Sequence, residues 1–196
     1  MKSFSIVGID EVGRGPIAGP VAVCSFCCNP EFFDTISIKT PLRDSKKLSK
    51  KQREEWFIYL KEQKELGNCD FAVSLISAEW IDKVGIVRSI QKALDASLSK
   101  LNIQDRLLGS SLFLDGGLKA PKEFTDQKTI IKGDELHPVI SCASIVAKVS
   151  RDAIMARYSK EYPLYGFESH AGYGTKGHYN VIKKLGVTPL HRKSFL

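Results

Sequence analysis

The sequence predicts an α/β protein in which helices flank one central mixed sheet. Two apolar segments rich in Val, Ile and Phe, at residues 4–10 and 21–26, indicate strands near the start of the chain. Further along, helical patterns alternate with shorter strand patterns, the order expected when helices cover a sheet. With 196 residues the chain can bury one core, so we expect a single domain over residues 1–196.

The other elements follow in chain order. After a loop with a short strand at residues 36–38, Ser49 and Gln52 have the form of a capping box, which predicts a helix to about residue 64. A strand is expected at residues 69–76, and helical patterns cover residues 78–101. Short strands are expected at residues 112–115 and 129–131. The clearest helical pattern covers residues 141–158, and a shorter one at residues 176–185 gives a small C-terminal helical part.

Composition limits the class of protein. Hydrophobic residues make up 43% and charged residues 26%, which is typical of soluble globular proteins. No apolar run has the length of a membrane span, and the N-terminal residues lack a signal-peptide pattern. Five cysteines, an odd number, argue against a secreted disulfide framework, so we expect a cytoplasmic protein. The formal net charge of +7 favours a polyanionic partner.

Acidic residues stand where apolar strands end. Asp10 follows the first strand, Asp115 closes "LFLD" before two glycines, and Asp134 follows "IIKG". One such aspartate is usually a turn residue or a helix cap, but three of them together with Glu11 are poorly explained in that way. Carboxylates that converge at one sheet edge repel one another unless cations lie between them. Oxygen ligands of this kind suit Mg²⁺ or Mn²⁺, and two such ions about 4 Å apart serve in-line attack on phosphodiesters.

Adjacent acids raise a geometric question, because neighbours on a regular strand point to opposite faces. For Asp10 and Glu11 to reach one cluster, we expect the strand to end at Asp10, with Glu11 on turning backbone. Gly13 would supply the conformational freedom of that turn.

Other motifs fit this chain poorly. "GIDEVGRG" lacks the Gly-Lys-Ser/Thr of a Walker loop, and its glycine spacing does not match a dinucleotide fingerprint. Cys24 and Cys27 lie within a strand and are better explained as buried thiols than as zinc ligands. The histidines show no metal spacing, and no Gly-x-Ser-x-Gly elbow is present. A basic cluster at residues 43–53 is compatible with a solvated helix start or with a track for phosphates.

Six sequence blocks, in order, resemble ribonuclease HII, the type 2 ribonuclease H family, over nearly the whole chain. They are "GIDEVGRGPIAGPVAV", "LRDSKKLS", "LDGG", "SCASIVAKVSRD", "YGFESHAGYGTKGH" and "TPLHRKSF". The sister type HIII carries an additional N-terminal domain, which we do not expect before Met1. A longer C-terminal helix of some relatives is also not expected after Leu196.

The resemblance implies a ribonuclease H-like fold and an endonuclease that needs Mg²⁺ or Mn²⁺, with two ions when substrate is bound. It implies cleavage of RNA in RNA–DNA hybrids and incision on the 5′ side of single ribonucleotides in duplex DNA, leaving 3′-hydroxyl and 5′-phosphate ends. Asp10, Glu11 and Asp115 match the family's ligand positions. For the fourth ligand the sequence favours Asp134, although some bacterial relatives have a glutamate at the position of Val139.

The same resemblance implies residues that contact the nucleic acid. Gly13, Arg14 and Gly15 match the turn that contacts the ribose 2′-hydroxyl and its phosphate, and Tyr173 matches a residue that stacks near the next deoxyribose. Phosphate contacts are implied for Lys46 and Lys47. Lys148 and Arg151, expected on the polar face of the long helix, are further substrate-binding candidates, with ordinary solvation as the alternative.

Two residues depart from the family pattern. Gly117 stands where the central motif often has asparagine, and Ala171 stands where the C-terminal block often has lysine. The alternative functions are a catalytically inactive hybrid-binding module, which would usually have lost acidic ligands, and a Mg²⁺-dependent nucleoside-triphosphatase, for which the phosphate loop is missing. We expect a monomer.

Overall fold

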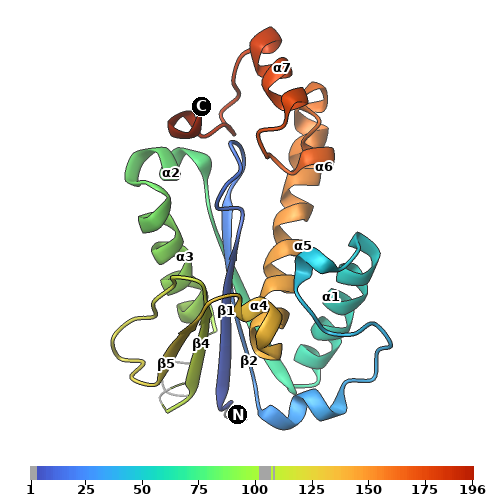
Figure 1. The fold of residues 1–196 in the computed structure, drawn as a ribbon, viewed down its shortest axis with the longest axis vertical. Coiled ribbons are helices and arrows are strands. Elements are labelled where there is room, and N and C mark those ends of the chain that lie inside the picture. Colours follow the sequence, from blue (N-terminus) through green and yellow to red (C-terminus); the bar gives the residue numbers. More distant parts are fainter. Residues whose placement is uncertain (1–3, 102–106, 108) are drawn as a thin grey trace.

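A five-stranded mixed sheet forms the centre of the protein in a computed structural model that describes residues 4–101, 107 and 109–196. The strands stand in the order β3-β2-β1-β4-β5, with β1 in the middle (Figure 1). β1 is antiparallel to β2 and parallel to β4. The strand bounds are Ile6–Val12 for β1, Val21–Cys28 for β2, Cys69–Ile76 for β3, Ser111–Asp115 for β4 and Gln127–Ile130 for β5.

Helices cover both faces of this sheet (Figure 1). On one face lie α2 and α3, and on the other lie α1 and the long α5. The α-helix bounds are Lys50–Glu65 for α1, Ala78–Val84 for α2, Ile86–Lys100 for α3, Gly133–Leu136 for α4, Pro138–Glu161 for α5, Phe167–His170 for α6 and Lys176–Leu185 for α7. Short 3₁₀ helices cover Pro30–Thr35, Ser45–Lys47, Pro163–Tyr165 and Lys193–Phe195.

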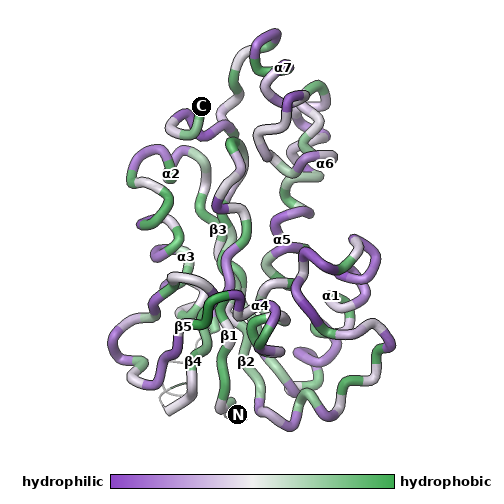
Figure 2. The backbone as a smooth tube through the Cα atoms, in the orientation of Figure 1, coloured by the Kyte–Doolittle hydropathy of each residue, from purple (hydrophilic) through white to green (hydrophobic). Residues whose placement is uncertain are grey.

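Alternation along the strands divides the core into two hydrophobic clusters. Odd-numbered residues of β1 and β2, such as Val7 and Val23, pack against α3, whereas Cys24 and Phe26 pack against α1 and α5. β2 is buried along its whole length, consistent with helices on both sides. Figure 2 shows apolar colour along much of β1, β2 and β4, and polar colour along much of the loops and outer helices.

The end of α5 extends beyond the sheet and carries the C-terminal part. A third cluster, formed by Ala18, Met155, Tyr165 and Phe167, joins this part to the loop after β1. An isolated bridge between Ala18 and His191 brings the end of the chain to the same loop. The loop between β1 and β2 is therefore enclosed by residues far away in the sequence.

The sequence predicted most of these elements and missed some. The Ser49 capping box is present, and the helix at residues 176–185 is found as α7. The short strand expected at residues 36–38 is wrong, because Ile36 and Ile38 pack on the core from irregular backbone after a 3₁₀ helix. Within the described residues, no helix combines the length and apolar character needed to cross a bilayer.

Candidate active site

The acidic site lies where β1 and β4 come together at the middle of the sheet. Their parallel pairing ends with Ile9 opposite Leu114, so Asp10 and Asp115 are the next residues on neighbouring strands. Parallel strands end at the same edge of a sheet, which is why two apolar strands far apart in sequence deliver adjacent carboxylates.

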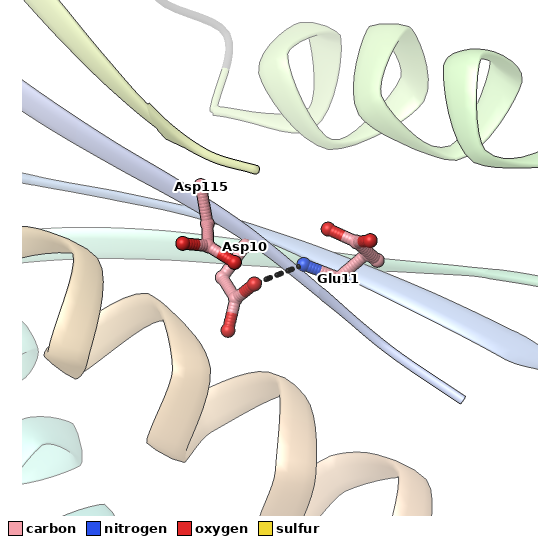
Figure 3. Close-up of side chains that lie close together, drawn as sticks. All are labelled: Asp10, Glu11 and Asp115. Atoms are coloured by element: carbon pink, nitrogen blue, oxygen red, sulfur yellow. Dashed lines mark hydrogen bonds between the residues drawn. The ribbon is translucent and has the colours of Figure 1, made fainter. Parts of the chain in front are cut away.

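Three carboxylates converge there. Asp10, Glu11 and Asp115 each offer an oxygen atom, and these oxygens lie within 4.8 Å of one another (Figure 3). The Asp10 side chain is 3% exposed and points toward α5, and its Oδ1 accepts a hydrogen bond of 2.7 Å from the backbone N–H of Glu11. The structure thus brings together three of the four predicted acidic residues.

Glu11 reaches this cluster by a different route from the one expected. The expected end of the strand at Asp10 is wrong, because β1 continues to Val12, which pairs with Ala22 of β2. The pairing of β1 with β4 stops earlier, at Ile9 and Leu114. On that side the edge of β1 is open, so the longer Glu11 side chain can approach Asp115 although it leaves the strand on the other face.

Burial and mutual repulsion disfavour the charged forms of these acids. The pKa of Asp10 is raised well above its ordinary value, first by burial and further by the charges of Glu11, Asp115 and Asp134. The pKa values of Glu11 and Asp115 are also raised, mainly by burial and then by a neighbouring carboxylate. A bound cation would relieve both effects, because it favours the ionised carboxylates.

The residues present fit a divalent metal ion. The Oε2 atom of Glu11 is buried and has no hydrogen-bond partner among the described residues, which is costly unless another group neutralises it. The donors are carboxylate oxygens, the ligands preferred by Mg²⁺ and Mn²⁺. Asp115 is oriented by a hydrogen bond of 2.7 Å from the backbone N–H of Gly133 to its Oδ1.

Asp134 lies beside this cluster but outside the group of three. It is 4% exposed, in α4, and its charge acts on both Asp10 and Asp115. Its Oδ2 accepts a hydrogen bond from Lys46 Nζ at 3.2 Å, and its backbone oxygen accepts one from the Ser141 hydroxyl at 2.8 Å. Its role as a fourth ligand remains a prediction.

The predicted recognition residues stand next to the acids. Arg14 Nη1 lies 3.6 Å from Glu11 Oε1, which connects the glycine-flanked loop to the carboxylates. Tyr173 is 47% exposed and faces the same loop, since a Cβ placed on Gly15 would lie 3.9 Å from Tyr173 Cε1. The two loops, separated by more than 150 residues in sequence, thus form one surface beside the acids.

The predicted lysines are each paired with an acid. Lys46 pairs with Asp134 and Lys47 with Glu135, which ties the segment before α1 to α4. Lys148 pairs with Asp152 one turn further along α5, at 2.8 Å. Contacts of these lysines with nucleic acid remain predictions.

Arg151 is not on a polar face, and that expectation is wrong. Its side chain is 0% exposed, and its guanidinium donates to the backbone oxygens of Pro20, Ala171 and Ala18 at 2.8, 2.9 and 3.3 Å. These acceptors come from loops distant in sequence, which explains how a helix can bury a cation at this position. Its substrate contact remains a prediction; what the structure shows is a link between the loop after β1 and the loop that contains Ala171.

Arg192 was missed by sequence reasoning. It lies in the block "TPLHRKSF", which carried the resemblance, but a single arginine in a polar segment gives no sign of burial. In the structure it is 0% exposed and touches the backbone of the Gly13–Gly15 loop. The one available signal was that Arg192 lies in a block that carried the resemblance to the family.

Comparison with known proteins gives the family. The sequence model described as Ribonuclease HII matches residues 7–196. Ribonuclease HII of Coxiella burnetii is 43% identical over 196 residues, covering 99% of this chain and 89% of the relative. Ribonuclease HII of Prochlorococcus marinus is 39% identical, covering 100% of this chain and 98% of the relative.

Solved structures agree in fold. The ribonuclease HII structure from Archaeoglobus fulgidus, solved in a complex with PCNA, aligns with a TM-score of 0.73 at 23% identity, covering 98% of this chain and 95% of that chain. Bst ribonuclease HIII in complex with Mn²⁺ aligns with a TM-score of 0.73 at 18% identity, covering 98% of this chain and 67% of that one. The expected ribonuclease H-like fold is confirmed.

Proposed function

This chain belongs to the ribonuclease HII family, and we propose that Asp10, Glu11, Asp115 and Asp134 hold the divalent metal ions with which it hydrolyses RNA. It is a ribonuclease H, an endoribonuclease that acts on RNA–DNA hybrids. The finer assignments below, of metal ligands, recognition residues and junction cleavage, are proposals.

The observation that supports the metal site is the convergence of three buried or half-buried carboxylates with an unpartnered oxygen on Glu11. Such a group is unfavourable in the absence of a cation and favourable around one. Mg²⁺ or Mn²⁺ bound by these residues would activate the attacking water and stabilise the leaving 3′-oxygen.

The protein's own groups prepare the site for this chemistry. The backbone N–H of Glu11 fixes one oxygen of Asp10, and the N–H of Gly133 fixes one oxygen of Asp115. These hydrogen bonds hold the carboxylates in place before substrate arrives, which limits the reorganisation needed for reaction. Lys46, next to Asp134, is placed to meet an incoming phosphate at the same edge.

We also propose incision on the 5′ side of single ribonucleotides in duplex DNA, leaving 3′-hydroxyl and 5′-phosphate ends. Gly13, Arg14 and Gly15 would contact the ribose 2′-hydroxyl and its phosphate, and Tyr173 would stack on the neighbouring deoxyribose. The 2′-hydroxyl is the group that distinguishes RNA from DNA at a given site. Tyr173 supports this proposal because it is half-exposed beside the loop that contains Arg14.

The remaining proposals concern the state of the protein. We propose a monomer that works as one catalytic domain over residues 1–196. The free thiols of Cys24, Cys28, Cys69 and Cys142 are typical of a reducing compartment and support a cytoplasmic location. Sedimentation of the purified protein and cell fractionation test these two statements.

One assay tests the main proposal. Three labelled substrates are incubated with Mg²⁺ or Mn²⁺. They are duplex DNA with a single ribonucleotide, an RNA–DNA hybrid duplex, and duplex DNA without ribonucleotides. We expect cleavage of the first two, with a cut on the 5′ side of the ribonucleotide. Asp115→Asn should abolish cleavage while duplex binding persists. An active Asp115→Asn enzyme would contradict the metal assignment, and a wild type that binds hybrids without cutting would identify an inactive binding module.

A second comparison tests junction recognition. Tyr173→Ala should lose activity on the single-ribonucleotide duplex more than on the long hybrid, because the hybrid offers many registers. Misplacement of reacting atoms by about 1 Å can cost on the order of a hundredfold in rate. Tyr173→Phe keeps the ring and serves as the control. Equal losses on both substrates would remove Tyr173 from junction recognition.

A further inference from the structure

Arg192 is a buried cation in the C-terminal segment that no step of the proposed reaction uses. It is 0% exposed, and among the ion pairs of the described residues none involves it. Burial, together with the charge of Arg151, lowers its pKa to about 9, so the guanidinium keeps its charge at neutral pH. A buried charge without a carboxylate requires hydrogen-bond acceptors in compensation.

Those acceptors are backbone oxygens of one loop. Nη2 of Arg192 donates to the carbonyl oxygen of Gly13 at 2.7 Å, and Nη1 donates to that of Arg14 at 3.0 Å. Nε donates to the carbonyl oxygen of Gly19 at 2.9 Å, and the Arg192 backbone N–H donates to Ile17 O at 2.7 Å. A planar guanidinium has the fixed donor geometry needed to bind several carbonyls at once.

The orientation of these carbonyls determines the direction of the next two amides. The described part of the chain contains no cis peptide bond, and in a trans peptide the C=O and the following N–H point in opposite directions. With the oxygens of Gly13 and Arg14 turned to Arg192, the N–H groups of Arg14 and Gly15 point away from it. Neither N–H has a hydrogen-bond acceptor within the residues that the structure describes.

Arg14 and Gly15 lie at the surface that Tyr173 and Glu11 also form. Arg14 lies 3.6 Å from Glu11, and Gly15 stands open toward Tyr173. Consecutive outward N–H groups form a concave donor site for an oxygen acceptor. In a ribonucleotide, such acceptors are the 2′-oxygen and the adjoining phosphate oxygens.

We propose that Arg192 is a positioning residue for ribose recognition: it holds the carbonyls of Gly13 and Arg14 so that the N–H groups of Arg14 and Gly15 face the ribonucleotide. This inference rests on the proposed function, in which this loop contacts the 2′-hydroxyl. Arg151 does not duplicate the role, because its acceptors are Pro20, Ala18 and Ala171 rather than the two peptides that face the substrate.

The test is discrimination between ribose and deoxyribose in binding. Dissociation constants are measured in the presence of a metal chelator, so that no cleavage occurs. The two ligands are a DNA duplex with one ribonucleotide and the same duplex made of DNA alone. Arg192→Lys keeps the charge but loses the fork of donors. We expect its preference for the ribonucleotide to fall by a factor of about 5–30, the size of one or two hydrogen bonds, with affinity for DNA little changed.

A control variant at Asp82 loosens the same segment and keeps the hydrogen-bond acceptors of the Arg192 guanidinium, although the charge of Asp82 also raises the pKa of Arg192. Asp82 accepts hydrogen bonds from the backbone N–H of Lys193 at 2.8 Å and of Ser194 at 3.0 Å. Asp82→Ala should lower the melting temperature yet keep the ribose preference. If it reduces the preference as much as Arg192→Lys does, the role of Arg192 is only to anchor the segment, and the inference is overturned.

The outcomes separate the inference from the proposed function. A wild type without preference for the ribonucleotide overturns both. A wild type with a preference that Arg192→Lys retains overturns the inference alone. If Arg192→Lys does not fold, the wild-type protein is studied by NMR, and the backbone amide resonances of Arg14 and Gly15 are followed as each duplex is added. They should shift with the ribonucleotide duplex and not with the DNA duplex, and equal shifts with both would overturn the inference.

Discussion

His178 and His191 are joined by a hydrogen bond between their Nε2 atoms, 3.0 Å apart, inside the C-terminal part. His191 Nδ1 accepts from the backbone N–H of Thr188 at 2.9 Å, so its own proton is on Nε2. That proton is donated to His178 Nε2, and His178 therefore carries its proton on Nδ1, which lies 2.9 Å from the backbone oxygen of Tyr173. Both imidazoles must be neutral for this chain of hydrogen bonds to exist.

Acid should therefore weaken the protein through these two histidines. Burial lowers the pKa of both in the folded protein, so the unfolded chain binds protons more readily. Their stabilising contribution is complete above the unfolded pKa of about 6.5 and is lost as pH falls from there toward the folded values. Urea unfolding between pH 8 and pH 5.5 should show falling stability in the wild type and a shallower fall in His178→Gln with His191→Gln. Equal slopes would contradict the assignment.

Asp10→Asn should stabilise the metal-free protein while abolishing cleavage. The pKa of Asp10 is raised by burial and by neighbouring carboxylates, so ionised Asp10 destabilises the fold as pH rises above its unfolded value of about 4. Asparagine keeps an acceptor for the Glu11 N–H and removes the charge. A gain of about 1 kcal/mol would raise the melting temperature by roughly 2–4 °C in a chain of this size.

Metal addition provides the control for this variant. Mg²⁺ or Mn²⁺ should raise the melting temperature of the wild type, because a ligand that binds the folded state stabilises it. The same addition should raise the melting temperature of Asp10→Asn much less. Equal metal-dependent shifts in the two proteins would separate Asp10 from the metal site.

Gly13 and Gly15 should respond differently to the same substitution. Gly13 has φ +91°, and an added Cβ would meet Arg151 Nε at 2.2 Å, whereas at Gly15 the nearest atom is Tyr173 Cε1 at 3.9 Å. We expect Gly13→Ala to lose about 1–3 kcal/mol of stability. Gly15→Ala should fold like the wild type but bind the ribonucleotide duplex more weakly, because its methyl group occupies the substrate face. Calorimetry and binding assays on both variants check this contrast.

The two lysines before α1 should carry part of the salt dependence. We expect Lys46 and Lys47 to leave Asp134 and Glu135 and to bind phosphates when substrate is present. The double variant Lys46→Ala with Lys47→Ala should then reduce the slope of log K for duplex binding against log salt by about 2. The control is the double variant Lys61→Ala with Lys122→Ala, which removes the same charge at two exposed positions. Its slope should stay closer to that of the wild type. If the two double variants have the same slope, the lysines form only a solvated helix start.

The acidic site could largely be predicted from the sequence, because Asp10 and Asp115 each directly follow an apolar run, and such runs indicate buried strand segments. The continuation of β1 to Val12 could not, since it depends on pairing with β2 on one side and on the early end of β4 on the other. Ile36 and Ile38 show the alternating pattern of a strand and pack on the core, but this segment forms no strand pairing in the described residues.

Buried arginines were the largest gap in the sequence prediction. Arg151 lies one turn from Ala147 and from Met155, both buried, yet its charge placed it on the polar face of the helix. Its acceptors, among them Ala18 and Ala171, come from loops whose positions depend on the complete fold. Sequence periodicity carries no information about such acceptors.

The contact between Arg192 and Arg14 can form only late in the synthesis of the chain. A chain is synthesised from its N-terminus, and the two residues are 178 positions apart. All four acids proposed as metal ligands precede residue 135, so they leave the ribosome well before Arg192. On our proposal a nascent chain acquires its hydrolytic residues first and its ability to distinguish ribose from deoxyribose last.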